Sequence, residues 1–330
     1  MSSRIRRSSL AIAAVLAFST SAHAVPFVLS NTPGDGTISV GVDGFGAFGS
    51  SVGGNSSNAI YDPVGALPAP AGTTFESGVA IRFSTSAGAR SFLTSGDIGG
   101  SGGLANPPVA GTSTSATSAF TSGPLSFALT QTLSPLFTGL DQTGSVLTQT
   151  YVITNTGAVA SSFELIRYLD GDLLFDGSLT DGGGRILLGS LEVLFETDSA
   201  TGSAASTTFV GITGEGGLVP ASARYEVDSF SGLRSRIIAG TALDEIITGD
   251  GVDLDQFVDA GGGYDITLAL RNVFDLDAGG TGTYVTRTIF GSGAPESIDI
   301  PDAGAVPEPA SLTLLGAALA GLAIRRRRRG

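Results

Sequence analysis

The stretch SSFELIRYL, residues 161–169, decides the fold class because its side chains follow the two-residue period of a β-strand. Alternate positions fall on two faces: Phe163, Leu165, Arg167 and Leu169 on one, and Glu164, Ile166, Tyr168 and Asp170 on the other. The stretch therefore predicts a strand.

Short apolar segments of the same kind, separated by Gly-, Ser- and Thr-rich turns, recur on both sides of this stretch. They are SGVAIRFST (77–85), LSFALTQTL (125–133), VLTQTYVITN (146–155), RILLGSLEVLFET (185–197), STTFVGIT (206–213), LRSRIIAG (233–240), YDITLALRNVF (264–274) and TYVTRTIFG (283–291). No segment before Ser311 sustains a helical period. We therefore expect an all-β protein, an antiparallel β-sandwich that can reach ten or more strands.

The stretch from Val146 to Asp172 predicts a hairpin that turns at Asn155-Thr156-Gly157. We expect one body over residues 25–300, because the strands near its start are too few to build a second core. Residues Gly99–Ser118, rich in Gly, Ser, Thr and Pro, are the place where the body could divide.

The charges are unevenly distributed along the 330 residues. All 17 basic residues are arginines, and eight of them lie at the two ends of the chain. The region between the ends therefore contains nine arginines and 30 acidic residues. Such an acidic body repels phosphates, and we expect no nucleic-acid partner.

Residues 1–24, MSSRIRRSSLAIAAVLAFSTSAHA, have the parts of a secretory signal peptide in order. Three arginines precede the apolar run Leu10–Phe18, and Ala22-His23-Ala24 forms an A-x-A cleavage site. The residues after Arg6-Arg7 fit twin-arginine export poorly, which favours the general secretory route. The mature chain is expected to begin at Val25.

Cleavage after Ala24 removes His23, the only histidine, and leaves a chain without His, Cys, Lys or Trp. This composition excludes His/Cys zinc sites, His-dependent nucleophiles, lysine Schiff bases and disulfides. Carboxylate, hydroxyl and tyrosine chemistry remains, which suits calcium binding or a two-carboxylate glycosidase.

The chain ends in VPEPASLTLLGAALAGLAIRRRRRG, residues 306–330. The uncharged segment Ser311–Ile324 would span about 21 Å as a helix, short of the roughly 30 Å of a bilayer core. We expect a linker over 301–309, a marginal transmembrane helix over 310–325 and a cytoplasmic tail over 326–330. The cluster Arg325, Arg326, Arg327, Arg328 and Arg329 would stop transfer by the positive-inside rule.

Pro307-Glu308-Pro309, the short apolar helix and the terminal arginines together resemble the PEP-CTERM sorting signal of Gram-negative bacteria. The resemblance covers about 24 residues. It implies an exosortase, a membrane-embedded processing enzyme, as partner, and an association with exopolysaccharide and biofilm. It implies a protein that is anchored briefly in the inner membrane and then reaches the cell envelope or the exterior. An ordinary tail anchor is the alternative.

Aspartates crowd into two loops, LDGDLLFDGSLTDGGG (169–184) and GDGVDLDQFVD (249–259). Asp-Gly pairs are common in turns, which accounts for many of these residues without a ligand. Clustered carboxylates also suit a hard cation, although neither loop has EF-hand spacing. One candidate calcium site follows: Asp170, Asp172, Asp176 and Asp181.

Three functions remain open for the body, for which no catalytic residue is assigned. The first is a non-enzymatic structural or interaction role in the envelope or extracellular matrix. The second is a carbohydrate-binding module acting on exopolysaccharide, in which tyrosines replace the absent tryptophan: Tyr61, Tyr151, Tyr168, Tyr225, Tyr264 and Tyr284. The third is a carboxylate-dependent glycoside hydrolase.

Overall fold

The computed structural model describes residues 26–65, 68–83, 88–198, 208–252, 254–293 and 295. The expected signal peptide, linker, transmembrane helix and arginine tail lie outside the described residues. Among the residues that are described, no helix combines the length and apolar character needed to cross a membrane.

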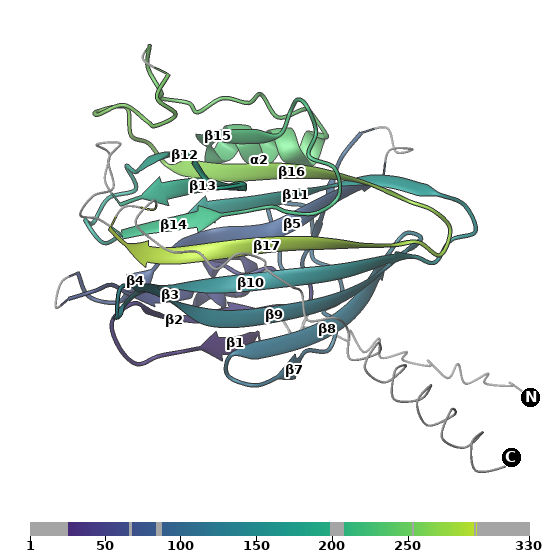
Figure 1. Cartoon of the computed structure of the whole chain (residues 1–330), viewed down its shortest axis with the longest axis horizontal. Helices are drawn as coiled ribbons and strands as arrows, with labels where there is room; N and C mark the ends of the chain where they lie inside the picture. The colour runs from purple at the N-terminus through teal and green to yellow at the C-terminus, as the bar shows by residue number, and fades with distance from the viewer. Residues whose placement is uncertain are drawn as a thin grey trace, which may run out of the picture.

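The described part of the chain folds into three antiparallel sheets (Figure 1). The largest, in spatial order, contains β12 (Gly182–Leu188), β13 (Leu191–Thr197), β14 (Thr208–Ile212), β17 (Thr281–Ser292), β10 (Asp141–Asn155), β9 (Leu125–Thr138), β8 (Ser115–Ser122) and β7 (Ala110–Gly111). The second contains β15 (Tyr225–Ser229), β16 (Ile266–Leu276), β11 (Ser161–Gly171), β5 (Thr74–Phe83) and β6 (Ser91–Leu93). The third contains β1 (Phe27–Ser30), β2 (Thr37–Val42), β3 (Ala59–Asp62) and β4 (Ala71–Gly72). The predicted all-β, antiparallel class is confirmed.

Strand β11, the stretch SSFELIRYL, lies inside the second sheet between β16 and β5. Phe163 and Leu165 pack in one hydrophobic cluster with Phe127 and Tyr151 of the large sheet. Arg167, on the same face, donates to the Thr288 hydroxyl of β17. The side chains that alternate with them pack on the other side of the sheet, so the predicted two faces are correct.

The predicted hairpin between β10 and β11 is wrong, because the two strands belong to different sheets. β10 pairs with β9 and β17, whereas β11 pairs with β5 and β16. The chain between them crosses from one layer to the other, and Asn155 holds the crossing by donating to the carbonyls of Val159, Leu276 and Asp277. A turn signal predicts reversal of the chain but not whether the flanking strands bond to each other.

A helix, α2 (Phe230–Ala239), replaces the strand expected at LRSRIIAG and lies over the second sheet (Figure 1). Its buried residues Leu233 and Ile237 are four positions apart, which is the spacing of one helix face. Gly240 ends the helix in the left-handed conformation. Two single turns, α1 (Ser50–Gly53) and the 3-10 helix Asn55–Ser57, complete the helical structure of the described residues.

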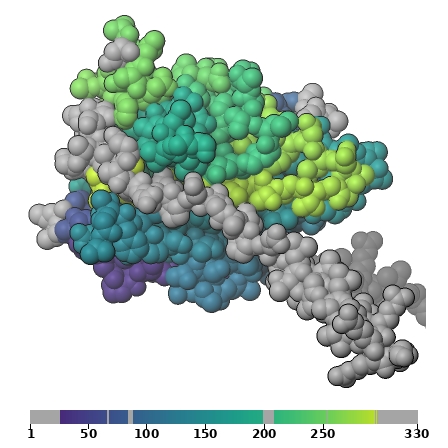
Figure 2. Space-filling view, in the orientation of Figure 1, coloured from purple at the N-terminus to yellow at the C-terminus, as the bar shows by residue number. Residues whose placement is uncertain are grey.

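The early strands share their core with both larger sheets. One cluster joins Val40 and Tyr61 of the third sheet to Leu147 of β10 and to Leu169 and Leu268 of the second sheet. In Figure 2 the purple residues of the N-terminal part lie directly against blue and teal residues that follow them in the chain. Within the expected boundary Gly99–Ser118, β7 and the first half of β8 are part of the large sheet.

Candidate functional site

The sorting and cleavage residues predicted from sequence all lie outside the described residues. They are Ala22, Ala24, Pro307, Glu308, Pro309 and Arg325–Arg329. The site that the structure describes is the predicted aspartate cluster at the end of β11.

The four predicted aspartates lie in very different surroundings. Asp170, the second-last residue of β11, is 2% exposed, and Asp181, which precedes β12, is 1% exposed. Asp172 is half-buried. Asp176 is exposed and accepts hydrogen bonds from the backbone and the hydroxyl of Ser178, which is turn chemistry. Two of the four therefore belong to the interior.

Glu196 of β13 is the residue that sequence reasoning missed. It is 0% exposed, and neither of its carboxylate oxygens receives a hydrogen bond from a donor group of the described residues. Its carboxylate occupies the space that a Cβ atom would need at Gly171. The sequence RILLGSLEVLFET could have predicted the burial of Glu196. The two-residue period of a strand places Glu196 on the same face as Leu194, which is buried.

Asp181 and Glu196 lie within hydrogen-bonding reach of each other. Two carboxylates have no proton to share, so this bond requires that one of the pair be protonated. Burial raises the pKa of both groups, and the negative charge of Asp198 and Asp176 adds to the effect at Asp181. The pair therefore favours holding a proton at pH values where an exposed carboxyl group would be ionised.

Further acids surround this pair, and we call the set the buried acid cluster: Asp170, Asp172, Asp181, Glu196, Asp198 and Asp265. Burial, followed by the charges of neighbouring acids, raises the pKa of Asp170 to about 8. Burial raises the pKa of Asp172 and of Asp198 to about 6. The charge of Arg234 of α2 opposes this rise in the pKa of Asp170 but is the smaller effect. Arg234 pairs directly with Glu76 at 3.0 Å.

A metal ion would need several carboxylates around one point. Among the described residues, no three Asp, Glu, His or Cys side chains converge in that way. Calcium at Asp170, Asp172, Asp176 and Asp181 remains a prediction. In the second aspartate loop, Asp255 accepts a hydrogen bond from the Phe257 backbone, and Asp253 lies outside the described residues.

The tyrosines do not form an exposed platform in the described structure. Four of the six are almost completely buried: Tyr61, Tyr151, Tyr168 and Tyr284. Tyr225 is half-buried beneath the guanidinium of Arg185, whose carbon lies 4.5 Å from the ring centre. Tyr264 is half-buried within the core that the sheets share. Their main role in the fold is packing.

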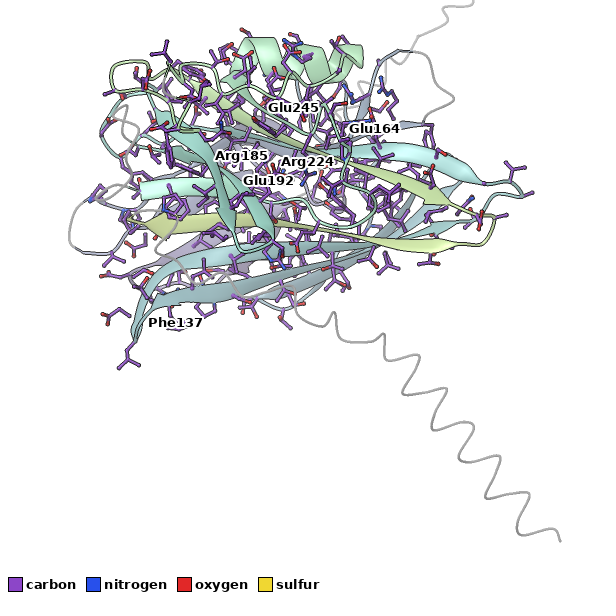
Figure 3. The ribbon with its side chains drawn as sticks, turned by 45° about the horizontal axis from the view of Figure 1, so that its top comes forward. Phe137, Glu164, Arg185, Glu192, Arg224 and Glu245 are labelled. Carbon is purple, nitrogen blue, oxygen red and sulfur yellow. The ribbon has the colours of Figure 1, made fainter. Side chains whose placement is uncertain are left out.

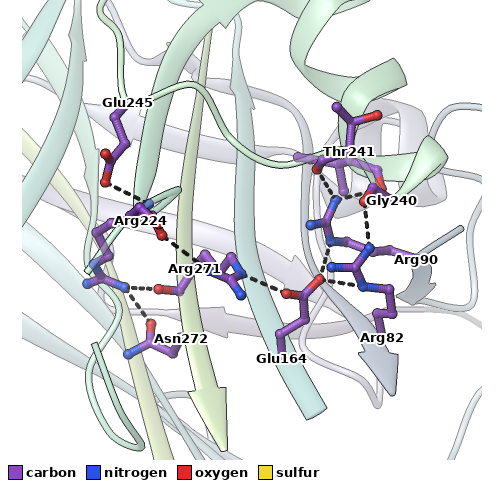
Figure 4. Close-up of polar contacts among 11 residues, drawn as sticks. Arg82, Arg90, Glu164, Arg224, Gly240, Thr241, Glu245, Arg271 and Asn272 are labelled. Carbon is purple, nitrogen blue, oxygen red and sulfur yellow. Dashed lines mark hydrogen bonds and ion pairs between the residues drawn. The ribbon is translucent and has the colours of Figure 1, made fainter. Parts of the chain in front are cut away.

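A second polar centre lies on the α2 side of the second sheet, where Glu164 of β11 binds three arginines (Figure 4). Its Oε1 lies 2.9 Å from Nε of Arg82 and 2.7 Å from Nε of Arg90, and its Oε2 lies 2.6 Å from Nε of Arg271. Burial alone would raise the pKa of Glu164, but hydrogen bonds and charge from Arg271 and Arg90 outweigh burial and lower it.

The same arginines hold the end of α2. Arg82 donates to the Gly240 carbonyl at 2.5 Å, and Arg90 donates to the carbonyls of Ile237 and Thr241. Cations at a helix C-terminus satisfy its free carbonyls and complement its dipole. The ion-pair network around Glu164 therefore attaches the C-terminal end of α2 to the second sheet, and this structural role accounts for it.

The network continues through Arg224, whose guanidinium donates to the Arg271 carbonyl and to the side-chain oxygen of Asn272 (Figure 4). The backbone N–H of Arg224 donates to the carboxylate of Glu245. Glu192 bridges Arg224 and Arg185, each at 2.7 Å. Figure 3 places Arg185, Glu192 and Arg224 close together, with Phe137 at a distant strand tip.

Comparison with known protein families gives a match at the C-terminal end of the chain. Residues 305–328 match the family model of the PEP-CTERM protein-sorting motif. The match confirms the predicted sorting signal and covers only this segment. A chain with this signal is exported and sorted by exosortase.

A search of curated proteins found no match. Among solved structures, "Putative kojibiose phosphorylase from human microbiome" aligns with 12% sequence identity and a TM-score of 0.36. The alignment covers 90% of this chain and 33% of the other, so the chain spans about a third of that protein's length. A TM-score of this size supports no argument about the body.

Proposed function

We propose that this protein is a non-enzymatic component of the cell envelope or extracellular matrix, associated with exopolysaccharide and biofilm. The sorting motif at residues 305–328 carries the proposal. Exosortase would process the precursor while its tail is anchored in the inner membrane, and the body would then remain in the envelope or leave the cell.

The burial of the paired acids and of most tyrosines supports a structural or interaction role for the body. Asp181 and Glu196 are a paired set of acids, but exposures of 1% and 0% keep a substrate from reaching them. A glycoside hydrolase needs two carboxyl groups that flank an accessible bond. The buried tyrosines likewise argue against stacking of sugars on aromatic rings.

Fractionation of cells with and without exosortase tests the proposal. We expect the precursor, with its tail, to accumulate in the inner membrane of cells that lack the enzyme. With the enzyme present, the body should be recovered from the outer envelope or the medium in a shorter form. Equal lengths and equal distribution in the two strains would contradict it.

A further inference from the structure

The outward side of four neighbouring strands of the large sheet is rich in threonine. Buried positions alternate with exposed or half-buried ones over residues 125–134 of β9, and with half-buried ones over residues 147–155 of β10, as burial of one sheet face requires. The outward positions of β8, β9, β10 and the start of β17, which lie side by side in Figure 1, form what we call the threonine face. It contains nine threonines, two serines, two alanines and one valine.

Strand register arranges these residues in four rows that cross the sheet. The rows are Ser115, Thr132 and Thr148; Thr117, Thr130 and Thr150; Ala119, Ala128, Val152 and Thr283; and Thr121, Ser126, Thr154 and Thr281. Neighbouring members are about 4.8 Å apart across the strands, and rows are about 7 Å apart along them. The result is a regular lattice of hydroxyl and methyl groups.

Most hydroxyls of the face, which are exposed or half-buried, have no partner among the described residues. Thr154 and Thr281 bond to each other at 3.2 Å, and Thr117 donates to the Ala110 carbonyl at 3.4 Å. The other members make no side-chain hydrogen bond with the described residues, and Thr130 and Thr132 are exposed. A threonine side chain has few rotamers, and its strand is already fixed, so binding would cost little ordering entropy.

The face carries no charge, although the body as a whole has nine arginines and 30 acids. The arginine nearest in register, Arg287 opposite Thr148, is buried and paired with Glu215. An acidic polymer, or a second copy of this acidic chain, would be repelled by the rest of the body. A protein partner would usually need aromatic or large apolar anchors, and the face offers only alanine and valine.

We propose that the threonine face binds a neutral, hydroxyl-rich polysaccharide chain laid across the strands. The hydroxyls would exchange hydrogen bonds with sugar hydroxyls, while the threonine methyls would pack against sugar C–H groups. Many weak contacts spread over four strands suit a long polymer better than a single sugar. The inference rests on the proposed association with exopolysaccharide and names the surface that would provide it.

The test uses exopolysaccharide purified from the producing cells and separated by anion exchange into neutral and acidic fractions. The processed protein is run through native gels that contain either fraction. We expect retardation by the neutral fraction only. The variant Thr130→Glu/Thr150→Glu, which places two charges in the middle of the face, should weaken this retardation by at least about tenfold, as expected when several hydrogen bonds are lost.

Three controls separate binding from folding. Thr130→Ser/Thr150→Ser keeps the hydroxyls and should still bind, and Thr130→Val/Thr150→Val keeps the shape but not the hydroxyls and should bind weakly. Ser231→Glu/Ser235→Glu adds the same charges at exposed positions of α2 and should bind as the parent does. All four variants should melt cooperatively.

Three outcomes would overturn the inference: no retardation by the neutral fraction, binding that Thr130→Glu/Thr150→Glu leaves unchanged, or a dimer in sedimentation that this variant abolishes. Sorting of the variants distinguishes this inference from the proposed function. Normal processing of the protein together with no binding of the neutral fraction would contradict the role of the threonine face and leave the proposed function standing.

Discussion

The carboxyl groups of Asp181 and Glu196 lie within hydrogen-bonding reach of each other inside the protein, 1% and 0% exposed, and no basic side chain of the described residues forms an ion pair with either. Asp181 precedes β12 and Glu196 belongs to β13, next to the end of β11. Burial therefore favours a proton on this pair, at the point where the three strand ends pack together.

Stability should fall as the pH rises. Burial raises the pKa of Asp170 to about 8 and raises those of Asp181 and Glu196, so the folded protein binds protons that the unfolded chain releases near pH 4. The stabilising contribution is complete below about pH 4 and is lost progressively up to about pH 8. Each such proton contributes a slope of about 1.4 kcal/mol per pH unit.

Calorimetric melting between pH 5 and pH 9 measures this slope. Glu196→Gln, whose amide can donate to Asp181 without a titrating proton, should flatten it, and Asp141→Asn at an exposed strand end should not. A melting temperature that is constant or rises over this range would contradict the shared proton.

Calcium should stabilise the protein more at pH 8 than at pH 6 if Asp170, Asp172, Asp176 and Asp181 bind it. At the lower pH the cation must displace protons from the two buried carboxyl groups. Binding to the folded state raises the melting temperature. Melting curves in calcium and in chelator that superimpose at both pH values would show that these acids bind no calcium.

Removal of the Glu164 charge should destabilise the fold by about 3 kcal/mol, the cost of breaking a buried ion pair. Glu164→Gln would leave Arg82, Arg90 and Arg271 facing one another, and the Arg90 side chain is only 1% exposed. Glu245→Gln is the matched control, because Glu245 binds a backbone amide of the same network. Urea denaturation measures the free energy of unfolding of both variants, and Glu245→Gln should lose less than Glu164→Gln.

A double-mutant cycle extends this test. Arg90→Met in the Glu164→Gln background should cost less than it does alone, because the unpaired buried charge is then gone. Additive losses would mean that Arg90 and Glu164 do not stabilise each other in the folded protein.

The sequence predicts strands well where a two-residue period is long, as in β9, β10, β11 and β17. It fails at LRSRIIAG, where Leu233 and Ile237 fit one helix face as well as they fit a strand. It also fails at Asn155, because a local turn motif does not encode which strands bond. The assignment of β10 and β11 to different sheets depends on contacts between residues distant in the chain.

The candidate site was predicted in part. The aspartate loop identified Asp170 and Asp181, but Glu196, some fifteen residues after Asp181, becomes relevant only when β13 brings it beside Gly171. The threonine face likewise requires the strand register, since each strand alone shows only an ordinary alternation of threonine with apolar residues.

The central claim is that exosortase recognises Pro307-Glu308-Pro309 while Arg325–Arg329 hold the tail at the membrane. The proline pair keeps the motif extended, and the arginines are costly to move across the apolar core. Intact mass and fractionation of two variants test this claim. Glu308→Ala should begin at Val25 and stay in the inner membrane with its tail uncut. Replacement of all five arginines by serine should instead release unprocessed protein from the membrane. A Glu308→Ala protein with the same C-terminal mass and the same distribution as the parent would contradict the account.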